Sequence, residues 1–577
     1  MKKIITLCAS LFLLAQAHAN PAFEQLLDDI WQFELRTDPI NATRHGVKGF
    51  EDKLRDLSAA TLQSQYEARL TLRARLLQVD DNMLSEDERI SKTIQLRELN
   101  NAIDEYRFHA HFVPLTSEYG FHNELAFLPS SSPLHTVEDY RHYLTRLTHI
   151  PRFIQQNIDW MKQGIAAGMT QPQAVLAGYE DSISAFVHTD AKDSVFYQPF
   201  ISLDKFPADT AQQLREQAQN VIKQQVMPAY QQYYDFFTTQ YYPAAKQDIA
   251  AANWPEGKAY YQNRIKHYTT TDLDAEAIHQ IGLNEVKRIR GEMQTVLDSL
   301  NFDGDINAFI AFLRTDPQFY AKSADELMRY AAYLSKRIDA RLPKLFYKLP
   351  RTPYGVAPVP DSIAPKYTTG RYIDPSRDDE PGYYWVNTYA LDKRPLYALP
   401  ALTLHEAVPG HHLQTSLARE MDGLPPIRRY SYISAFGEGW GLYSEYLGKE
   451  VGFYESAYDE FGRLSYEMWR ACRLVVDTGM HMMGWSRQQA LDYMLENTAL
   501  SEHNIRTEVD RYISWPAQAL SYKMGEITIK ELRRKAEAEL GDKFDLRAFH
   551  DAVLAHGSIP LDELRRQVDK FIRQHKA

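Results

Sequence analysis

The 577-residue chain lacks several features that would assign it to a common class of protein. It has only two cysteines, so it is not a small domain held together by disulfides. After the N-terminus, no apolar run reaches the ~18 residues needed to span a bilayer. It has no basic block, and its formal net charge of −11 argues against nucleic acid as a partner. It also lacks a Gly-rich phosphate loop and the G-x-S-x-G motif of serine hydrolases.

The first nineteen residues have the pattern of a secretory signal peptide. A basic pair is followed by an apolar run, and Ala17-His18-Ala19 is a small-x-small cleavage site. Cleavage before Asn20 would remove two lysines, lower the net charge from −11 to −13, and leave Cys472 as the single cysteine. Cys8 lies inside the apolar run, which argues against a lipoprotein cleavage site. We therefore expect a secreted, periplasmic bacterial protein with no stable membrane insertion and no intramolecular disulfide.

Helical periodicity dominates the first half of the chain. Apolar residues recur at helical spacing from Phe23 to Leu35 and again from Ala208 to Gln240. Thr136 is followed by two acidic residues and predicts a helix start, because a hydroxyl caps free N–H groups and acids favour the positive end of the helix dipole. The segment Thr271–Asp274 predicts the start of another helix.

The pattern changes between Pro343 and Pro381, where eight prolines exclude a regular element and predict an extended connection. The aromatic segment from Gly382 to Tyr389 is the best strand candidate. Helices are expected again from Pro395 to the C-terminus. We therefore predict a single, mainly α domain from residue 20 to 577 with a small β element.

The run HEAVPGHH, which begins at His405, concentrates the chemistry of the chain. Neutral imidazole is the commonest protein ligand for zinc, and a carboxylate such as Glu406 can deprotonate a metal-bound water. On a straight helix His411 would point roughly 120° away from His405, unlike the second histidine of H-E-x-x-H. Pro409 breaks the helix and Gly410 lets the chain turn, so we expect a bulge that brings the two histidines together. The alternative is a kinked helix with buried core histidines.

Four motifs in this order resemble the bacterial family catalogued as domain of unknown function 885. They are HEAVPGHHLQ from His405, FGEGWGLYSE from Phe436, RLVVDTGMH from Arg473 and ALSYKMGE from Ala519. The earlier segment from Ala259 to Ile289 resembles it too, so the likeness covers nearly the whole mature chain. The resemblance implies a zinc-dependent, peptidase-like protein, distantly similar to angiotensin-converting enzyme and the thimet-type oligopeptidases. It implies a large two-lobed helical fold with a central cleft beside the small β element, with lobes at about residues 20–250 and 251–577.

The resemblance also implies the metal ligands. His405 and His411 would bind zinc, and a catalytic zinc usually has three protein ligands and one open position. Glu438 matches the downstream glutamate of this class and is the predicted third ligand. Glu445 is the alternative third ligand, or else a partner that orients a histidine. His412 is the alternative to His411.

Further roles are assigned to residues near these motifs. Glu406 is the predicted general base, and Tyr522 resembles the substrate-facing tyrosine that stabilises a developing oxyanion. His481 is predicted to donate to the same intermediate. Tyr522 could instead be an ordinary core tyrosine.

Substrate binding is predicted for cations and for the strand. Arg473, Arg511 and Lys523 would bind acidic groups of the substrate, although Arg473 could instead pair with a neighbouring aspartate. Tyr384 and Asn387 lie on the predicted strand, which would pair as an edge strand with an extended peptide or would close the cleft floor.

We therefore predict a zinc metallopeptidase that cleaves oligopeptides with water activated by Glu406. One alternative is a zinc-dependent hydrolase of a non-peptide amide, because the same machinery cleaves any suitably held amide. Another is a non-catalytic protein that binds zinc or peptides. The intact Glu406 argues against the last alternative, because a structural metal site needs no base.

Overall fold

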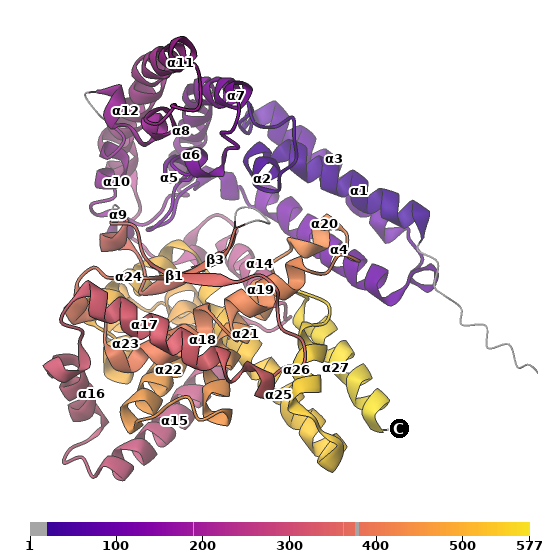
Figure 1. The fold of residues 1–577 in the computed structure, drawn as a ribbon, viewed down its shortest axis with the longest axis vertical. Helices are drawn as coiled ribbons and strands as arrows, with labels where there is room; N and C mark the ends of the chain where they lie inside the picture. Colours follow the sequence, from indigo (N-terminus) through magenta and orange to yellow (C-terminus); the bar gives the residue numbers. More distant parts are fainter. Residues whose placement is uncertain (1–19, 188–189, 362, 376–379, 577) are drawn as a thin grey trace, which may run out of the picture.

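The computed structural model describes residues 20–187, 190–361, 363–375 and 380–576, and it is mainly α-helical with one small sheet (Figure 1). The predicted signal peptide, residues 1–19, lies outside the described residues. Within the described ranges no helix is both long enough and apolar enough to cross a membrane.

The first half of the chain forms the upper part of the molecule in Figure 1. Two predicted helix signals are confirmed: the apolar stripe that includes Phe23 and Ile30 is buried in α1, and Thr136 caps α7 in a reciprocal pair of hydrogen bonds with Asp139. The helices are α1 (Pro21–Thr37), α2 (Pro39–Arg44), α3 (Ala59–Leu77), α4 (Glu86–Arg107), α5 (Phe121–Leu125), α6 (Leu128–Ser131), α7 (Val137–Thr148), α8 (Ile150–Ala167), α9 (Gln173–Leu176), α10 (Glu180–Ser184), α11 (Ala208–Val221), α12 (Met227–Phe236) and α13 (Tyr242–Ala244).

The helix predicted from Ala208 to Gln240 is interrupted by two π-helical turns. These turns, Ile222–Val226 and Phe237–Tyr241, separate α11, α12 and α13. Each lies just before a proline, Pro228 or Pro243. Proline has no N–H and its ring clashes with the carbonyl four residues earlier, so a wider turn lets the helix continue past it.

The second half of the chain packs around the long helix α22, which is buried from Phe461 to His481. The predicted start at Thr271–Asp274 is confirmed, because Asp274 caps α15. The helices are α14 (Gly257–Thr269), α15 (Ala275–Leu300), α16 (Ile306–Thr315), α17 (Ala324–Asp339), α18 (Leu399–Glu406), α19 (His411–Arg419), α20 (Pro426–Arg429), α21 (Ser434–Glu450), α22 (Ala457–Met482), α23 (Arg487–Asn497), α24 (Glu502–Ser514), α25 (Ser521–Leu540), α26 (Leu546–Leu554) and α27 (Leu561–Lys576).

The sheet lies near the boundary between the two halves in Figure 1. It consists of β1 (Tyr354–Pro358), β2 (Gly370–Ile373) and β3 (Gly382–Val386) in the order β1-β3-β2, with β1 parallel and β2 antiparallel to β3. The predicted strand Gly382–Tyr389 is confirmed as β3 up to Val386. Of the two roles considered for it, the edge strand is wrong, because β3 lies between β1 and β2. β1 and β2 fit into the proline-rich segment because its prolines lie outside the strands or, as Pro358 does, at a strand end.

Candidate metal centre

The predicted bulge in the histidine motif is a complete break between two helices. Helix α18 ends at Glu406, α19 begins at His411, and the connecting turn contains a cis Val408–Pro409 peptide bond. A Cβ atom on Gly410 would lie 1.9 Å from the carbonyl oxygen of His405, so only glycine fits there. The turn brings the imidazole rings of His405 and His411 to 4.8 Å between centroids, nearly perpendicular to one another.

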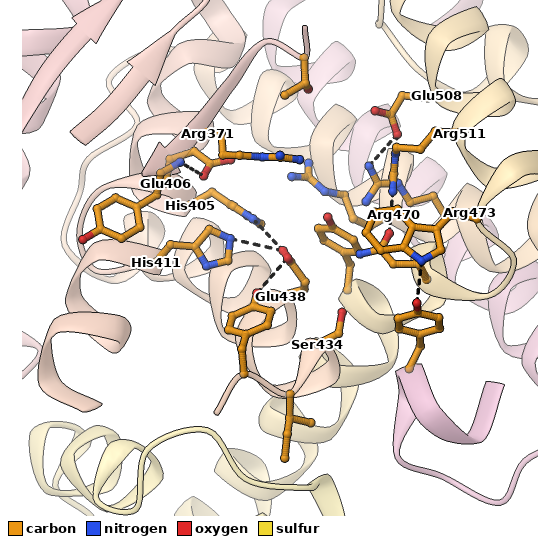
Figure 2. A pocket seen from close by; sticks show the side chains of 18 of the residues that line it. Arg371, His405, Glu406, His411, Ser434, Glu438, Arg470, Arg473, Glu508 and Arg511 are labelled. Atoms are coloured by element: carbon orange, nitrogen blue, oxygen red, sulfur yellow. Dashed lines mark hydrogen bonds and ion pairs between the residues drawn. The ribbon is translucent and has the colours of Figure 1, made fainter. Parts of the chain in front are cut away.

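Glu438 on α21 completes a group of three possible metal ligands with the two histidines. These three residues, His405, His411 and Glu438, are called the donor group below. One of its carboxylate oxygens lies 3.6 Å from Nε2 of His405 and 3.3 Å from Nε2 of His411. Tyr432 donates to its other oxygen at 2.9 Å. Ligands about 2.0–2.2 Å from a tetrahedral zinc ion are about 3.3–3.6 Å apart, so the donor types and separations suit zinc. Figure 2 shows the three side chains converging.

A second carboxylate orients His405. Glu445 on α21 is buried and lies 2.8 Å from Nδ1 of His405, on the ring edge away from Glu438, and it also pairs with Arg470 at 3.2 Å. In metal-binding histidines the far ring nitrogen commonly donates its N–H to a carboxylate, which selects the tautomer whose other nitrogen is free to bind a metal. Gly441 makes room for the ring, since a Cβ atom there would lie 2.8 Å from it. Of the two roles considered for Glu445, the geometry favours the histidine partner.

His412 lies outside this group. Its Nδ1 is 3.0 Å from the hydroxyl of Tyr372 on β2, and its Nε2 is 3.0 Å from the carbonyl oxygen of Thr352. Burial lowers the pKa of His412 to about 4, so the ring is neutral. His412 therefore joins α19 to the sheet, and it does not replace His411 in the donor group.

Glu406 extends into the same cavity beside the donor group (Figure 2). The backbone N–H of Tyr372, on the edge strand β2, donates to its Oε2 at 2.7 Å. The carboxylate is therefore held at a defined position at the end of α18.

The donor group opens into a cavity of about 490 Å³. Its walls come from β2, α4, α14, α18, α19, α21, α22, α24 and α25, so both halves of the chain contribute. Tyr522 lies between the donor group and a set of arginines, with its ring centroid 6.3 Å from that of His405 and 4.2 Å from the guanidinium carbon of Arg473. Burial and the charge of Glu438 raise the pKa of Tyr522, so its hydroxyl remains a hydrogen-bond donor at neutral pH.

Of the predicted substrate-binding cations, Arg473 and Arg511 line the cavity and Lys523 does not. Both arginines pair with Glu508, at 2.9 and 3.0 Å, and the alternative pairing of Arg473 with Asp477 is absent from the ion pairs of the described residues. Lys523 follows Tyr522 on α25 and points about 100° away from it. Its ammonium group is buried among three carboxylates at 2.8–2.9 Å, those of Glu285, Glu467 and Glu526.

His481 and the predicted strand residues also lie away from the cavity. Nε2 of His481 lies 3.0 Å from the carbonyl oxygen of Tyr512, its Nδ1 accepts from the N–H of Ala251, and burial lowers its pKa to about 4. Tyr384 is fully buried, and the amide of Asn387 donates to the carbonyl oxygens of three preceding loop residues. These residues stabilise the fold, because His481 on α22, Tyr384 on β3 and Asn387 just after β3 are buried in the core and do not line the cavity.

Several residues that line the cavity were not predicted. Arg470 lies one helical turn before Arg473 on α22, and that spacing is a signal that the sequence contains. Arg371 and Tyr372 belong to β2, inside the proline-rich segment where no strand was predicted.

Comparison with known proteins gives a family and two similar folds. The family described as "Bacterial protein of unknown function (DUF885)" matches residues 39–568. The crystal structure of a protein from Colwellia psychrerythraea, described as a "putative lipoprotein", has a TM-score of 0.90 and 28% identity, covering 96% of this chain and 99% of that one. A protein from Shewanella oneidensis, described as a "putative lipoprotein of unknown function", has a TM-score of 0.72 and 17% identity, covering 94% and 98%, and it shows the fold alone. No curated protein matches the sequence.

Proposed function

The chain belongs to this bacterial family of unknown function, DUF885, and we propose that it is an exported zinc-dependent hydrolase that cleaves oligopeptides. The observation that carries the proposal is the convergence of donor atoms from His405, His411 and Glu438 at the wall of a cavity that also contains Glu406. Three protein donors leave a zinc ion one position for water or substrate, as in catalytic sites. The same ligand types support a distant relationship to angiotensin-converting enzyme and the thimet-type oligopeptidases.

The proposed mechanism assigns proton transfer to Glu406. A bound zinc ion would polarise the scissile carbonyl and increase the acidity of water at the site. Glu406 would take a proton from the attacking water and pass it to the leaving amine. The N–H of Tyr372 donates to one oxygen of this carboxylate and holds it in place, which leaves the other oxygen to exchange the proton. Tyr522 would donate its hydroxyl hydrogen to the carbonyl oxygen as negative charge develops there.

An extended peptide suits the cavity because β2 is an edge strand and residues 368–372 line the wall. Apart from the N–H of Tyr372, which donates to Glu406, main-chain groups on its free edge could pair with a peptide, one of the two roles that the sequence analysis considered for β3. Export is supported by the signal-peptide pattern and by the similar protein from Colwellia psychrerythraea that is described as a "putative lipoprotein".

Mass-spectrometric profiling of a diverse peptide library tests the proposal. The library is incubated with zinc-loaded protein, with protein treated with a chelator, and with the Glu406→Gln variant. We expect cleavage by the zinc-loaded protein alone, and the variant should still bind one zinc ion per chain because Glu406 is not in the donor group. Loss of the general base should lower the rate by at least about 100-fold.

The outcomes separate the alternatives. Cleavage that persists in the variant would refute the role of Glu406, and cleavage that persists after complete metal removal would refute the role of zinc. No cleavage by any sample, with zinc bound, would reject oligopeptides as substrates.

A further inference from the structure

Of the five arginines that line the cavity, four gather on the wall that faces the donor group across Tyr522. This arginine cluster consists of Arg371 from β2, Arg470 and Arg473 from α22, and Arg511 from α24. Figure 2 shows Arg371 reaching across the cavity from the sheet toward the other three. Three separate elements therefore direct positive charge to one region.

Fewer carboxylates than arginines form ion pairs in the cluster. Arg473 and Arg511 share Glu508, and Arg470 pairs with Glu445. Arg371 donates to the hydroxyl of Tyr119 and forms no ion pair among the described residues. Glu118 lines the same wall, and burial raises its pKa.

Arg473 supplies an unpartnered donor at the centre of the cluster. Its side chain is 3% exposed, yet Nη1 has no hydrogen-bond partner among the described residues. Its guanidinium carbon lies 4.4 Å from the ring centroid of Trp469 and 4.2 Å from that of Tyr522, so two aromatic rings fix its position. Leaving a buried charged donor unpaired costs free energy, which an anionic ligand in the cavity would offset.

The cluster is close to the proposed reaction centre. The separations from His405 to Tyr522 and from Tyr522 to Arg473 together span at most about 10.5 Å, the length of about three extended residues. A ligand anchored at Arg473 would therefore place an amide bond one to three residues away beside Glu406.

We propose that the arginine cluster binds a carboxylate of the substrate, located within about three residues of the amide bond that is cleaved. This inference rests on the proposed function, because it takes the donor group as the reaction centre. A carboxylate suits this cluster, because guanidinium groups bind it through paired charge-assisted hydrogen bonds and the neighbouring donor group is proposed to act on peptides. The carboxylate is either the C-terminus of a peptide or an acidic side chain near the cleaved bond, and the experiment distinguishes the two.

Peptide retention by the zinc-loaded Glu406→Gln variant tests the inference without requiring turnover. Three pools of hexapeptides share the same diverse sequences at the first five positions. The first pool has a free C-terminal carboxylate, the second is amidated, and the third is amidated with Asp or Glu at the last position. We expect the first pool to be retained at least about tenfold more strongly than the second, because a charge-assisted hydrogen bond is lost on amidation. Retention of the third pool identifies a side-chain carboxylate as the ligand.

Adding Arg371→Gln to the Glu406→Gln variant should reduce the preference for the carboxylate pool over the amidated pool to less than about threefold. Arg371 is the suitable position because it lies on an edge strand, while Arg473 and Arg511 are buried in the core. The matched control is Arg351→Gln, which removes an exposed arginine paired with Glu420 outside the cavity and should leave the preference unchanged. Circular dichroism confirms that each variant is folded.

Equal retention of all three pools, or retention of none, would overturn the inference. A preference that survives Arg371→Gln and Arg473→Lys in folded protein would also overturn it. The cleavage assay with wild-type protein is read separately. Carboxylate preference without any cleavage would leave the binding site standing and refute the hydrolase. Cleavage that depends on neither a terminal nor a side-chain carboxylate would leave the hydrolase standing and refute the binding site.

Discussion

His411 and His412 are adjacent in the chain and chemically identical, but α19 directs them to different surroundings. Successive residues on a helix are rotated by about 100°. This rotation places His411 beside Glu438 and His412 against the sheet, where it contacts Tyr372 and Thr352. The pair therefore separates the consequences of losing a metal donor from those of losing a buried histidine.

Replacing His411 with Ala should weaken zinc binding by on the order of 100-fold or more, since loss of an outer partner alone typically costs 10–100-fold. His412→Ala should keep one zinc ion per chain. It should lower the free energy of unfolding by about 1–3 kcal/mol, because the Tyr372 hydroxyl and the Thr352 carbonyl lose a buried partner. Chelator competition gives the zinc affinity, and elemental analysis after dialysis gives the stoichiometry. A variant of His411 that retains full affinity would show that Glu438 and His405 do not share a metal with it.

At the scale of elements, the turn between α18 and α19 determines whether the donor group forms. Gly410→Ala would place a methyl group on the carbonyl of His405 and force the two helices apart. We expect a loss of more than about 3 kcal/mol in the free energy of unfolding, above the usual range for one extra buried methylene, together with weaker zinc binding. Gly423→Ala is the control, since a Cβ atom there meets nothing within 4 Å, and it should change stability by less than about 0.5 kcal/mol. Denaturant unfolding measures the stability of both variants. Equal stabilities would show that the turn can adapt to the extra methyl group.

Elements with local signals were predictable from the sequence, and elements that depend on distant partners were not. The apolar stripe of α1 and the cap of α7 lie within one turn or one face of a helix. Strand β2 has four residues, and its hydrogen bonds go to β3, so nothing in its own sequence marks it as a strand. Arg371 was missed for this reason.

The same distinction applies to the candidate site. The spacing of His405 and His411 and the downstream Glu438 carried enough information to propose a donor group, because each belongs to a compact motif. Lys523 was placed wrongly because nearness to Tyr522 in sequence does not give the direction of a side chain on α25. Two carboxylates from other helices, Glu285 and Glu467, which the sequence alone could not bring together, determine its position with Glu526 on its own helix.

At the scale of the whole molecule, the two halves of the chain are joined by specific polar contacts. Arg428 donates to the hydroxyl of Ser91 at 3.0 Å, and the side chain of Gln171 donates to the carbonyl oxygen of Ser514 at 2.9 Å. The cavity itself is lined from both halves, since α4 contributes to its wall. These contacts suggest that the halves unfold together, although the predicted boundary near residue 250 stays a prediction.

Zinc binding measures the size of this cooperative unit. Zinc at 100 times its dissociation constant should stabilise the folded state by about 2.7 kcal/mol. At about 2.1 cal/mol/K per residue, the unfolding entropy of the whole mature chain is about 1.2 kcal/mol/K, so the melting temperature should rise by about 2 °C. If the second half unfolded alone, its smaller entropy would give a rise of about 4 °C from the same binding energy. Calorimetry with zinc and with a chelator distinguishes these values, and we expect the smaller one because the polar contacts between the halves must break when either half unfolds.

Glu406→Gln should show the same rise in melting temperature and His411→Ala almost none, since only the latter removes a metal donor. A rise in the His411 variant equal to that of the wild type would locate the stabilising zinc elsewhere in the chain.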